Sequence, residues 1–169
     1  NHDEVSFVRE NEIPSNLIMF NDEYKSVIYD DVVVTGIVLT ALNQKVIYDN
    51  LVLDAEKTNI VAMHGQVVGY KSQEKAEVIS LPKLKDKNID YLALGHIHSH
   101  SENKLDDRGR YAFSGCLEGR GFDEMGEKGF VLLEVDGAVK STFIPFAQRT
   151  IHECSVDVTG TENGYQAYH

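Results

Sequence analysis

The sequence predicts a β-rich α/β fold that ends in a C-terminal β-hairpin. Two apolar runs without a polar face, Asn59–Met63 and Ile89–Leu94, have the length and composition of strands that are buried on both sides. A helical pattern precedes each run, and the order helix, strand, helix, strand is typical of α/β proteins. Two further apolar runs flank Asp136-Gly137, a pair of residues that favours a hairpin turn.

The N-terminal part of the sequence predicts short strands and one surface helix. The apolar run Leu17–Phe20 is typical of a short buried strand. Asp30-Asp31 separates the runs 26–29 and 32–39, which we expect to form two strands joined by a tight turn. Residues 42–57 place apolar side chains at roughly the helical period, which predicts a helix on the surface.

The second half of the sequence predicts one more helix and three strands. Residues 79–87 combine leucines with interspersed lysines and indicate a short amphipathic helix. After a glycine-rich segment, Phe130–Val135 and Val139–Phe146 are expected to pair as a hairpin, because Asp136-Gly137 can supply the positive φ angles of a type I′ turn. Ile151–Val158 alternates enough to predict a last strand.

The composition is that of one soluble globular domain. The 169 residues are 42% hydrophobic and 25% charged, which excludes disorder along the whole chain. No apolar run approaches the roughly 20 residues that cross a bilayer, so we expect no membrane partner. Two scattered cysteines, Cys116 and Cys154, exclude a disulfide framework and fit a reducing cytoplasm. Because the net charge is −11, any chemistry on phosphate must depend on local groups.

Histidines follow both buried strands at their carboxyl ends. His64 ends the first strand, and His96 and His98 follow the second. Side chains at positions i and i+2 point the same way in an extended segment, so His96 and His98 can face one site if this segment is strand-like. His64 reaches the same site if the two strands are neighbours. Imidazole ligands suit borderline divalent ions such as Mn, Fe or Zn, and the sequence therefore predicts a shared metal site.

Three short motifs occur in an order that resembles the calcineurin-like metallophosphoesterase superfamily. The segments similar to its Gly-Asn-His-Asp/Glu, His and Gly-His-x-His motifs are Asn1-His2-Asp3, Met63-His64-Gly65 and Gly95-His96-Ile97-His98. Tyr91–His98 and Ser114–Glu124 look most like the bacterial DNA-repair exonuclease branch that includes SbcD. The resemblance implies that residues 1–158 are the second half of a four-layer α/β/β/α sandwich. Residues 159–169 would then be a tail or the start of a linker to a further domain.

The resemblance also implies a centre of two divalent metal ions, Mn in preference to Fe or Zn. Asn1, His64 and His96 would bind the second ion, and His98 would bind the first. His2 would face the scissile phosphate and protonate the leaving oxygen, which suits a group with an ordinary pKa of about 6.5. Two ions about 3.5 to 4 Å apart can share a hydroxide that attacks phosphorus at neutral pH.

Two further residues of the second half have competing explanations. Arg120, in the glycine-rich segment, can act as a bidentate clamp on a substrate phosphate. The alternative is that this segment only makes tight turns before the hairpin and leaves Arg120 in solvent. His100 is expected to be a solvated loop residue outside the metal site.

The function that the resemblance implies is that of a phosphoesterase, with a phosphodiesterase or DNA exonuclease as the closest match. The family's Asp-x-His and Gly-Asp-x-x-Asp motifs, which supply most ligands of the first ion, do not precede Asn1. We therefore expect the chain to begin inside a longer protein, to need the N-terminal half of the domain as its partner, and to be inactive alone. Two alternatives remain open: a metal-binding module without turnover, and a structural half-domain.

Overall fold

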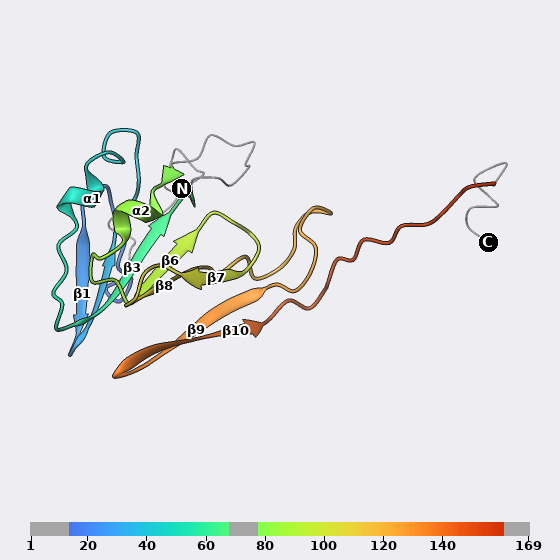
Figure 1. Ribbon diagram of the computed structural model, residues 1–169. Coiled ribbons are helices and arrows are strands. Elements are labelled where there is room, and N and C mark those ends of the chain that lie inside the picture. Colours follow the sequence, from blue (N-terminus) through green and yellow to red (C-terminus); the bar gives the residue numbers. More distant parts are fainter. Residues whose placement is uncertain (1–13, 68–77, 161–169) are drawn as a thin grey trace.

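A six-stranded mixed sheet forms the centre of the protein, which a computed structural model describes over residues 14–67 and 78–160 (Figure 1). Its strands are β1 (Lys25–Tyr29), β2 (Val32–Gly36), β3 (Thr58–His64), β6 (Tyr91–Gly95), β7 (Ser101–Lys104) and β8 (Arg110–Phe113). Their order in the sheet is β1-β2-β3-β6-β8-β7. The four central strands run parallel, and β1 and β7 pair antiparallel at the edges.

Two short helices, a short ladder and a hairpin accompany this sheet in the described ranges. The helices are α1 (Ile47–Asn50) and α2 (Leu81–Leu84), the parallel ladder joins β4 (Gln66–Val67) to β5 (Val78–Ile79), and the antiparallel hairpin consists of β9 (Gly129–Asp136) and β10 (Ala138–Pro145). Figure 1 shows that the chain after β10 extends away from the rest of the molecule.

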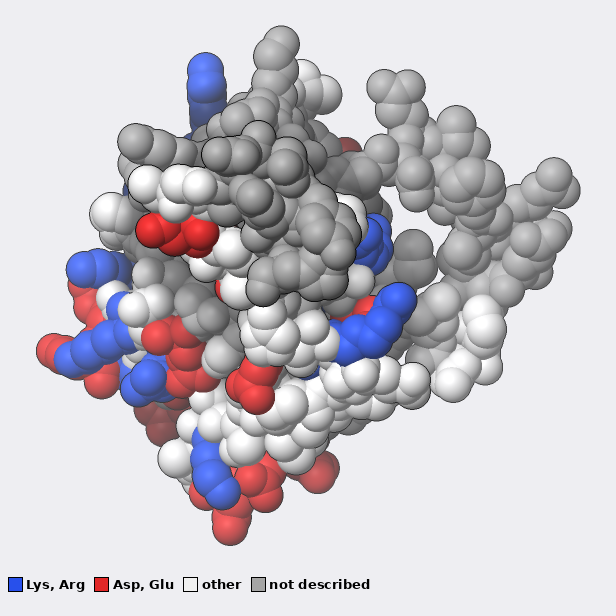
Figure 2. Space-filling model, turned by 90° about the vertical axis from the view of Figure 1, so that its right-hand side faces the viewer, with Lys and Arg blue, Asp and Glu red and all other residues white. Residues whose placement is uncertain are grey.

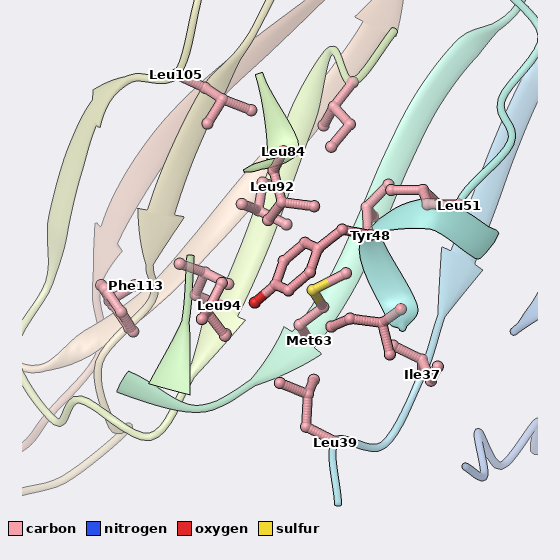
Figure 3. Packing of buried hydrophobic residues seen from close by; sticks show 14 of the residues in the cluster. Ile37, Leu39, Tyr48, Leu51, Met63, Leu84, Leu92, Leu94, Leu105 and Phe113 are labelled. Carbon is pink, nitrogen blue, oxygen red and sulfur yellow. The ribbon is translucent and has the colours of Figure 1, made fainter. Parts of the chain in front are cut away.

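The hydrophobic core lies between the sheet and the two helices. Alternate residues of β3 are buried, as expected for a strand that turns one face to a core. Figure 3 shows the Tyr48 ring of α1 among Met63, Leu92 and Leu94 of β3 and β6. The Tyr48 hydroxyl accepts a hydrogen bond from the Ser80 N–H (2.8 Å) and so ties α1 to the start of α2. Complete burial of a side chain such as Leu92 stabilises the fold by about 1.5 to 3 kcal/mol.

Small residues occupy the opposite face of the sheet, toward the hairpin. Ala62, Ala93 and Ala112 are register partners across β3, β6 and β8. A pocket of about 320 Å³ lies between this face and Val131 and Leu133 of β9. The hairpin therefore forms a second β layer, and the described part of the chain has three layers: helices, sheet and hairpin.

The described part confirms a β-rich architecture with a C-terminal hairpin, and it shows that the sheet is mixed and that the helices are few and short. Strands β3 and β6 form where the sequence predicts them. Of the helix predicted over residues 79–87 only Leu81–Leu84 is helical, and Ile79 belongs to β5. The turn between β9 and β10 differs from the prediction, because Gly137 has a positive φ (69°) but Asp136 does not. A type I′ turn needs positive φ at both central residues, so the prediction of that turn type was wrong.

Two predicted strands were wrong because the segments have no strand to pair with. Leu17–Phe20 is not a strand, and Leu17 and Met19 are each 47% exposed. Only Phe20 of this segment packs on the sheet, where its ring covers Gly36 so closely that a Cβ there would lie 2.3 Å from it. Ile151–Val158 makes one isolated bridge, from Ile151 to Gly126, and no strand.

The predicted helix over residues 42–57 was wrong except at α1. The side chain of Asn43 accepts a hydrogen bond from the Thr40 N–H (2.8 Å) and donates one to the Val38 carbonyl (2.9 Å). Such side-chain bonds offer the backbone an alternative to the helical ladder, and turns occupy residues 41–46. Across residues 14–67 and 78–160, no helix has both the length and the apolar character that spanning a membrane requires.

Candidate metal centre

Three neighbouring parallel strands deliver side chains to one edge of the sheet. β3 ends at His64, β6 leads directly into His96 and His98, and β8 leads into the segment that contains Cys116. The carboxyl ends of parallel strands meet at the same edge, which is where ligands bind in open α/β sheets. The three histidines line one open pocket of about 540 Å³ with Gly95, Ile97, Gly115, Cys116, Leu117, Glu118 and Arg120.

The rings of His64 and His96 approach each other edge-on. Their centroids are 5.5 Å apart and their planes are inclined by 73°. His64 and Gly95 are register partners on β3 and β6, and a Cβ at Gly95 would lie only 2.8 Å from His64 Nδ1. The absence of a side chain at Gly95 is therefore what allows the His64 imidazole to lie against the neighbouring strand.

The backbone turns sharply at His96. Strand β6 ends at Gly95, and His96 has a φ of 100°, in a region that strongly favours glycine. The segment from His96 to His98 is therefore not extended, and the expectation that it is strand-like was wrong. His96 and His98 nevertheless both line the pocket. The turn of the backbone at His96, and not the regular geometry of a strand, brings the two side chains to the same side. A residue other than glycine in such a conformation costs about 1 to 3 kcal/mol, and such strain clusters at functional sites.

His98 is fixed from two sides by the segment that follows β8. Its ring nitrogen Nδ1 is hydrogen-bonded to Glu124, whose other carboxylate oxygen accepts the Arg120 N–H. These two bonds, from the Arg120 backbone first and from His98 second, hold the pKa of the Glu124 carboxyl below its usual value, although partial burial opposes this effect. The His98 carbonyl accepts hydrogen bonds from Lys128 Nζ (2.9 Å) and from Cys116 Sγ (3.5 Å).

His98, Cys116 and Glu124 also form a cluster of possible metal ligands. One ligand atom from each residue lies within 4.8 Å of the others. Imidazole, thiolate and carboxylate are the ligand types that bind zinc in proteins. The sequence analysis did not select Glu124 as a ligand, because this residue is separated from His98 by 26 positions and lies in an irregular segment. Its only signal was its place at the end of the Ser114–Glu124 stretch that resembles the exonuclease branch.

Four other residues named from the sequence are Arg120, Asn1, His2 and His100. Arg120 is exposed and lines the pocket, and its role as a phosphate clamp stays a prediction. Asn1 and His2 lie outside the described residues. His100 is not a solvated loop residue as expected: its Nδ1 donates to the Phe113 carbonyl (3.1 Å) and its ring stacks on Phe143, with centroids 4.4 Å apart.

Comparison with known proteins assigns no family to the chain. No protein-family model matches the sequence, and no curated protein matches it.

Proposed function

We propose that the chain is part of a metal-dependent phosphoesterase whose metal centre includes His64, His96 and His98. The observation that carries the proposal is that the three histidines leave two neighbouring parallel strands at the same edge and line one pocket. The order of the motifs in the sequence supports the same assignment.

The arrangement of the histidines fits a divalent ion of the Mn or Zn class. A nitrogen that ligates such an ion lies about 2.1 Å from it, which puts the ring centroid at about 3.2 Å. Two imidazoles on one ion therefore have centroids at most about 6.4 Å apart. The 5.5 Å between His64 and His96 lies within this limit.

The residues of the pocket have different proposed roles in phosphate-ester hydrolysis. Divalent ions supply an activated water and neutralise the charge that develops at phosphorus. His64, His96 and His98 hold the metal, and the guanidinium of Arg120 binds phosphate oxygens from the rim of the pocket. The resemblance assigns Asn1 to the metal and His2 to protonation of the leaving oxygen.

The fuller architecture is part of the same proposal. In this proposal the hairpin β9–β10 is the start of the second β layer. The half of the domain that contains the Asp-x-His and Gly-Asp-x-x-Asp motifs completes this layer and, with it, the four-layer sandwich. The pocket of about 320 Å³ between the hairpin and the face of Ala62, Ala93 and Ala112 supports this, because it leaves space on that face for more side chains of the second β layer.

The proposed substrate class is a phosphodiester, with DNA as the polymer that the resemblance indicates. On the face shown in Figure 2, the described Lys and Arg side chains are interspersed with Asp and Glu side chains. The described residues of this face therefore present no continuous basic track for a duplex. Recognition of the substrate is assigned to the pocket itself, through Arg120.

The experiment is an assay of the intact protein with Mn²⁺ against bis(4-nitrophenyl) phosphate and against single-stranded DNA. We expect hydrolysis of at least the small diester, reduced by about 100-fold or more in His64→Ala and His96→Ala. His152→Ala is the matched control, because His152 is exposed and does not line the pocket. If the protein with its metal confirmed bound cleaves neither substrate, the enzyme proposal is wrong. One tightly bound zinc ion without turnover would instead indicate the metal-binding module.

A further inference from the structure

We propose that Glu124 is a positioning residue that keeps the His98 imidazole protonated at Nδ1 and so presents Nε2 to a metal ion. This inference rests on the proposed function, because it takes His98 to be a metal ligand. It adds a residue that none of the motifs includes and assigns the glycine-rich segment a task in the site.

Both carboxylate oxygens of Glu124 are engaged. Oε1 contacts His98 Nδ1 and Oε2 accepts the Arg120 N–H, and the side chain is only 12% exposed. An ionised carboxylate can only accept hydrogen bonds, so the ring nitrogen that faces it must be the donor. A neutral imidazole with its proton on Nδ1 has its free lone pair on Nε2. The contact therefore selects the nitrogen that can bind a metal.

The same segment of the chain fixes the backbone of His98. The His98 carbonyl accepts two hydrogen bonds, one from the ammonium group of Lys128, a residue that is only 3% exposed, and one from the Cys116 thiol. Gly115, with a φ of 82°, lets this segment pass close to the backbone around His98, because a Cβ there would lie 3.4 Å from the His98 carbonyl oxygen and 3.1 Å from the His100 nitrogen. Ring and main chain of His98 are therefore held by one segment, as is common for metal-binding histidines that donate their second nitrogen to a carboxylate.

Direct binding of a metal by Glu124 is the competing arrangement. His98, Cys116 and Glu124 lie close enough to share an ion. However, the direct contact between His98 Nδ1 and Glu124 leaves no room for an ion between these atoms, and the Cys116 thiol is bonded to a carbonyl. An ion on all three residues would require Glu124 to swing away and release the Arg120 N–H. The positioning role needs no such rearrangement.

The first test measures the tautomer of His98 in the full chain without metal, by the nitrogen-15 shifts of its imidazole. We expect the proton on Nδ1 in the wild type and in Glu124→Gln, because a glutamine side-chain oxygen can still accept it. We expect a mixture of tautomers in Glu124→Ala. Glu127→Ala is the matched control, since it removes the same charge from an exposed position of the same segment. A wild-type proton on Nε2 overturns the inference.

The second test measures Mn²⁺ affinity by titration calorimetry on the same four proteins. We expect Glu124→Ala to weaken binding by about 10- to 100-fold, Glu124→Gln to recover most of the loss, and Glu127→Ala to bind like the wild type. Thermal unfolding checks that each variant is folded. If Glu124→Ala is not, Glu124→Met takes its place, because methionine keeps the length of the side chain but has no carboxylate to accept the His98 proton.

The outcomes separate the two proposals. A wild type that shows the expected tautomer but binds no Mn²⁺ refutes the proposed function, and with it the metal role of Glu124. A wild type that binds Mn²⁺ with the same affinity as Glu124→Ala refutes the inference alone. A thiolate-to-metal absorption band after Co²⁺ addition, lost in Cys116→Ser, also refutes it, because Cys116 and Glu124 would then be direct ligands.

Discussion

Replacement of Gly95 by alanine is a direct way to disturb the proposed metal site without removing one of its proposed ligands. Gly95 is the register partner of His64, and an added Cβ would lie 2.8 Å from His64 Nδ1. Ordinary van der Waals contact begins at about 3.4 Å, so the imidazole must move by about 0.6 Å, the difference between the two distances. Metal–nitrogen distances are satisfied only to within about 0.2 Å. The substitution should therefore weaken the bond from His64 to a metal.

The effect of Gly95→Ala on stability should be small. Alanine in place of glycine at a compatible backbone position stabilises a fold by about 0.4 to 1 kcal/mol through the unfolded state. The displaced ring offsets this gain, and because a side chain rather than backbone has to move, we expect the net change to stay within about 1 kcal/mol. For a chain of this size that corresponds to a shift of the melting temperature of at most about 4 °C.

The assay combines Mn²⁺ titration with thermal unfolding of the wild type and two glycine variants. We expect Gly95→Ala to lose about tenfold or more in Mn²⁺ affinity while it unfolds near the wild-type temperature. Gly109→Ala is the contrasting variant, because its Cβ would lie 1.9 Å from the backbone oxygen of Ile89. That clash has no flexible side chain to absorb it, so we expect a loss of about 3 kcal/mol or more.

Two results would contradict this reasoning. Unchanged Mn²⁺ affinity in Gly95→Ala would show that His64 is not held where a metal needs it. A large loss of stability in Gly95→Ala, similar to that in Gly109→Ala, would show that the close approach at Gly95 serves the packing of the sheet and not the position of the imidazole.

Three further variants test other parts of the structure. His96→Gly should raise the melting temperature, because glycine relieves the φ of 100° at His96, and should weaken Mn²⁺ binding; a lower melting temperature would argue against strain. Arg108→Ala should lower the free energy of unfolding, measured in urea, by roughly 2 kcal/mol. The reason is that the Arg108 guanidinium donates hydrogen bonds to both carboxylate oxygens of Asp90 and to two backbone carbonyls. An unchanged free energy of unfolding would show that these hydrogen bonds add nothing beyond those that the same groups make with water. Burial raises the pKa of the Asp106 carboxyl, but hydrogen bonds from three backbone N–H groups outweigh this effect, and the pKa is lower than its ordinary value. Its contribution is therefore present above about pH 4, the ordinary value, and lost as pH falls through the lower folded pKa; the stability difference between wild type and Asp106→Asn should shrink in urea titrations below pH 4, and a constant difference would contradict this.

Strands β3 and β6 were predictable from the sequence because each is a continuous apolar run, although β3 is fully buried on one face only and not on both as expected. β3 and β6 form within two residues of the expected positions. The parallel pairing of these strands brings His64 next to Gly95, which is the condition that the sequence required for a shared site. Local composition was sufficient here because the two strands that contribute to the core also end at the proposed site.

Other elements depend on partners that a local pattern does not reveal. Leu17–Phe20 has the composition of a strand but no neighbouring strand, and it contributes Phe20 to the cover of Gly36 instead. The helical period over residues 42–57 is overridden after β2 by the side-chain hydrogen bonds of Asn43. Glu124 was not predictable, because its contact with His98 joins two irregular segments that no periodicity relates.

We propose that His64 and His96, with His98 in the same pocket, hold a divalent metal. Anomalous diffraction from a crystal of the protein grown with Mn²⁺ tests this most directly. We predict an anomalous peak in the pocket at about 2.1 Å from one nitrogen of His64 and one of His96. The absence of an anomalous peak from the pocket would contradict this proposal. A metal ion bound by His98, Cys116 and Glu124, with His64 and His96 turned away from it, would contradict it as well.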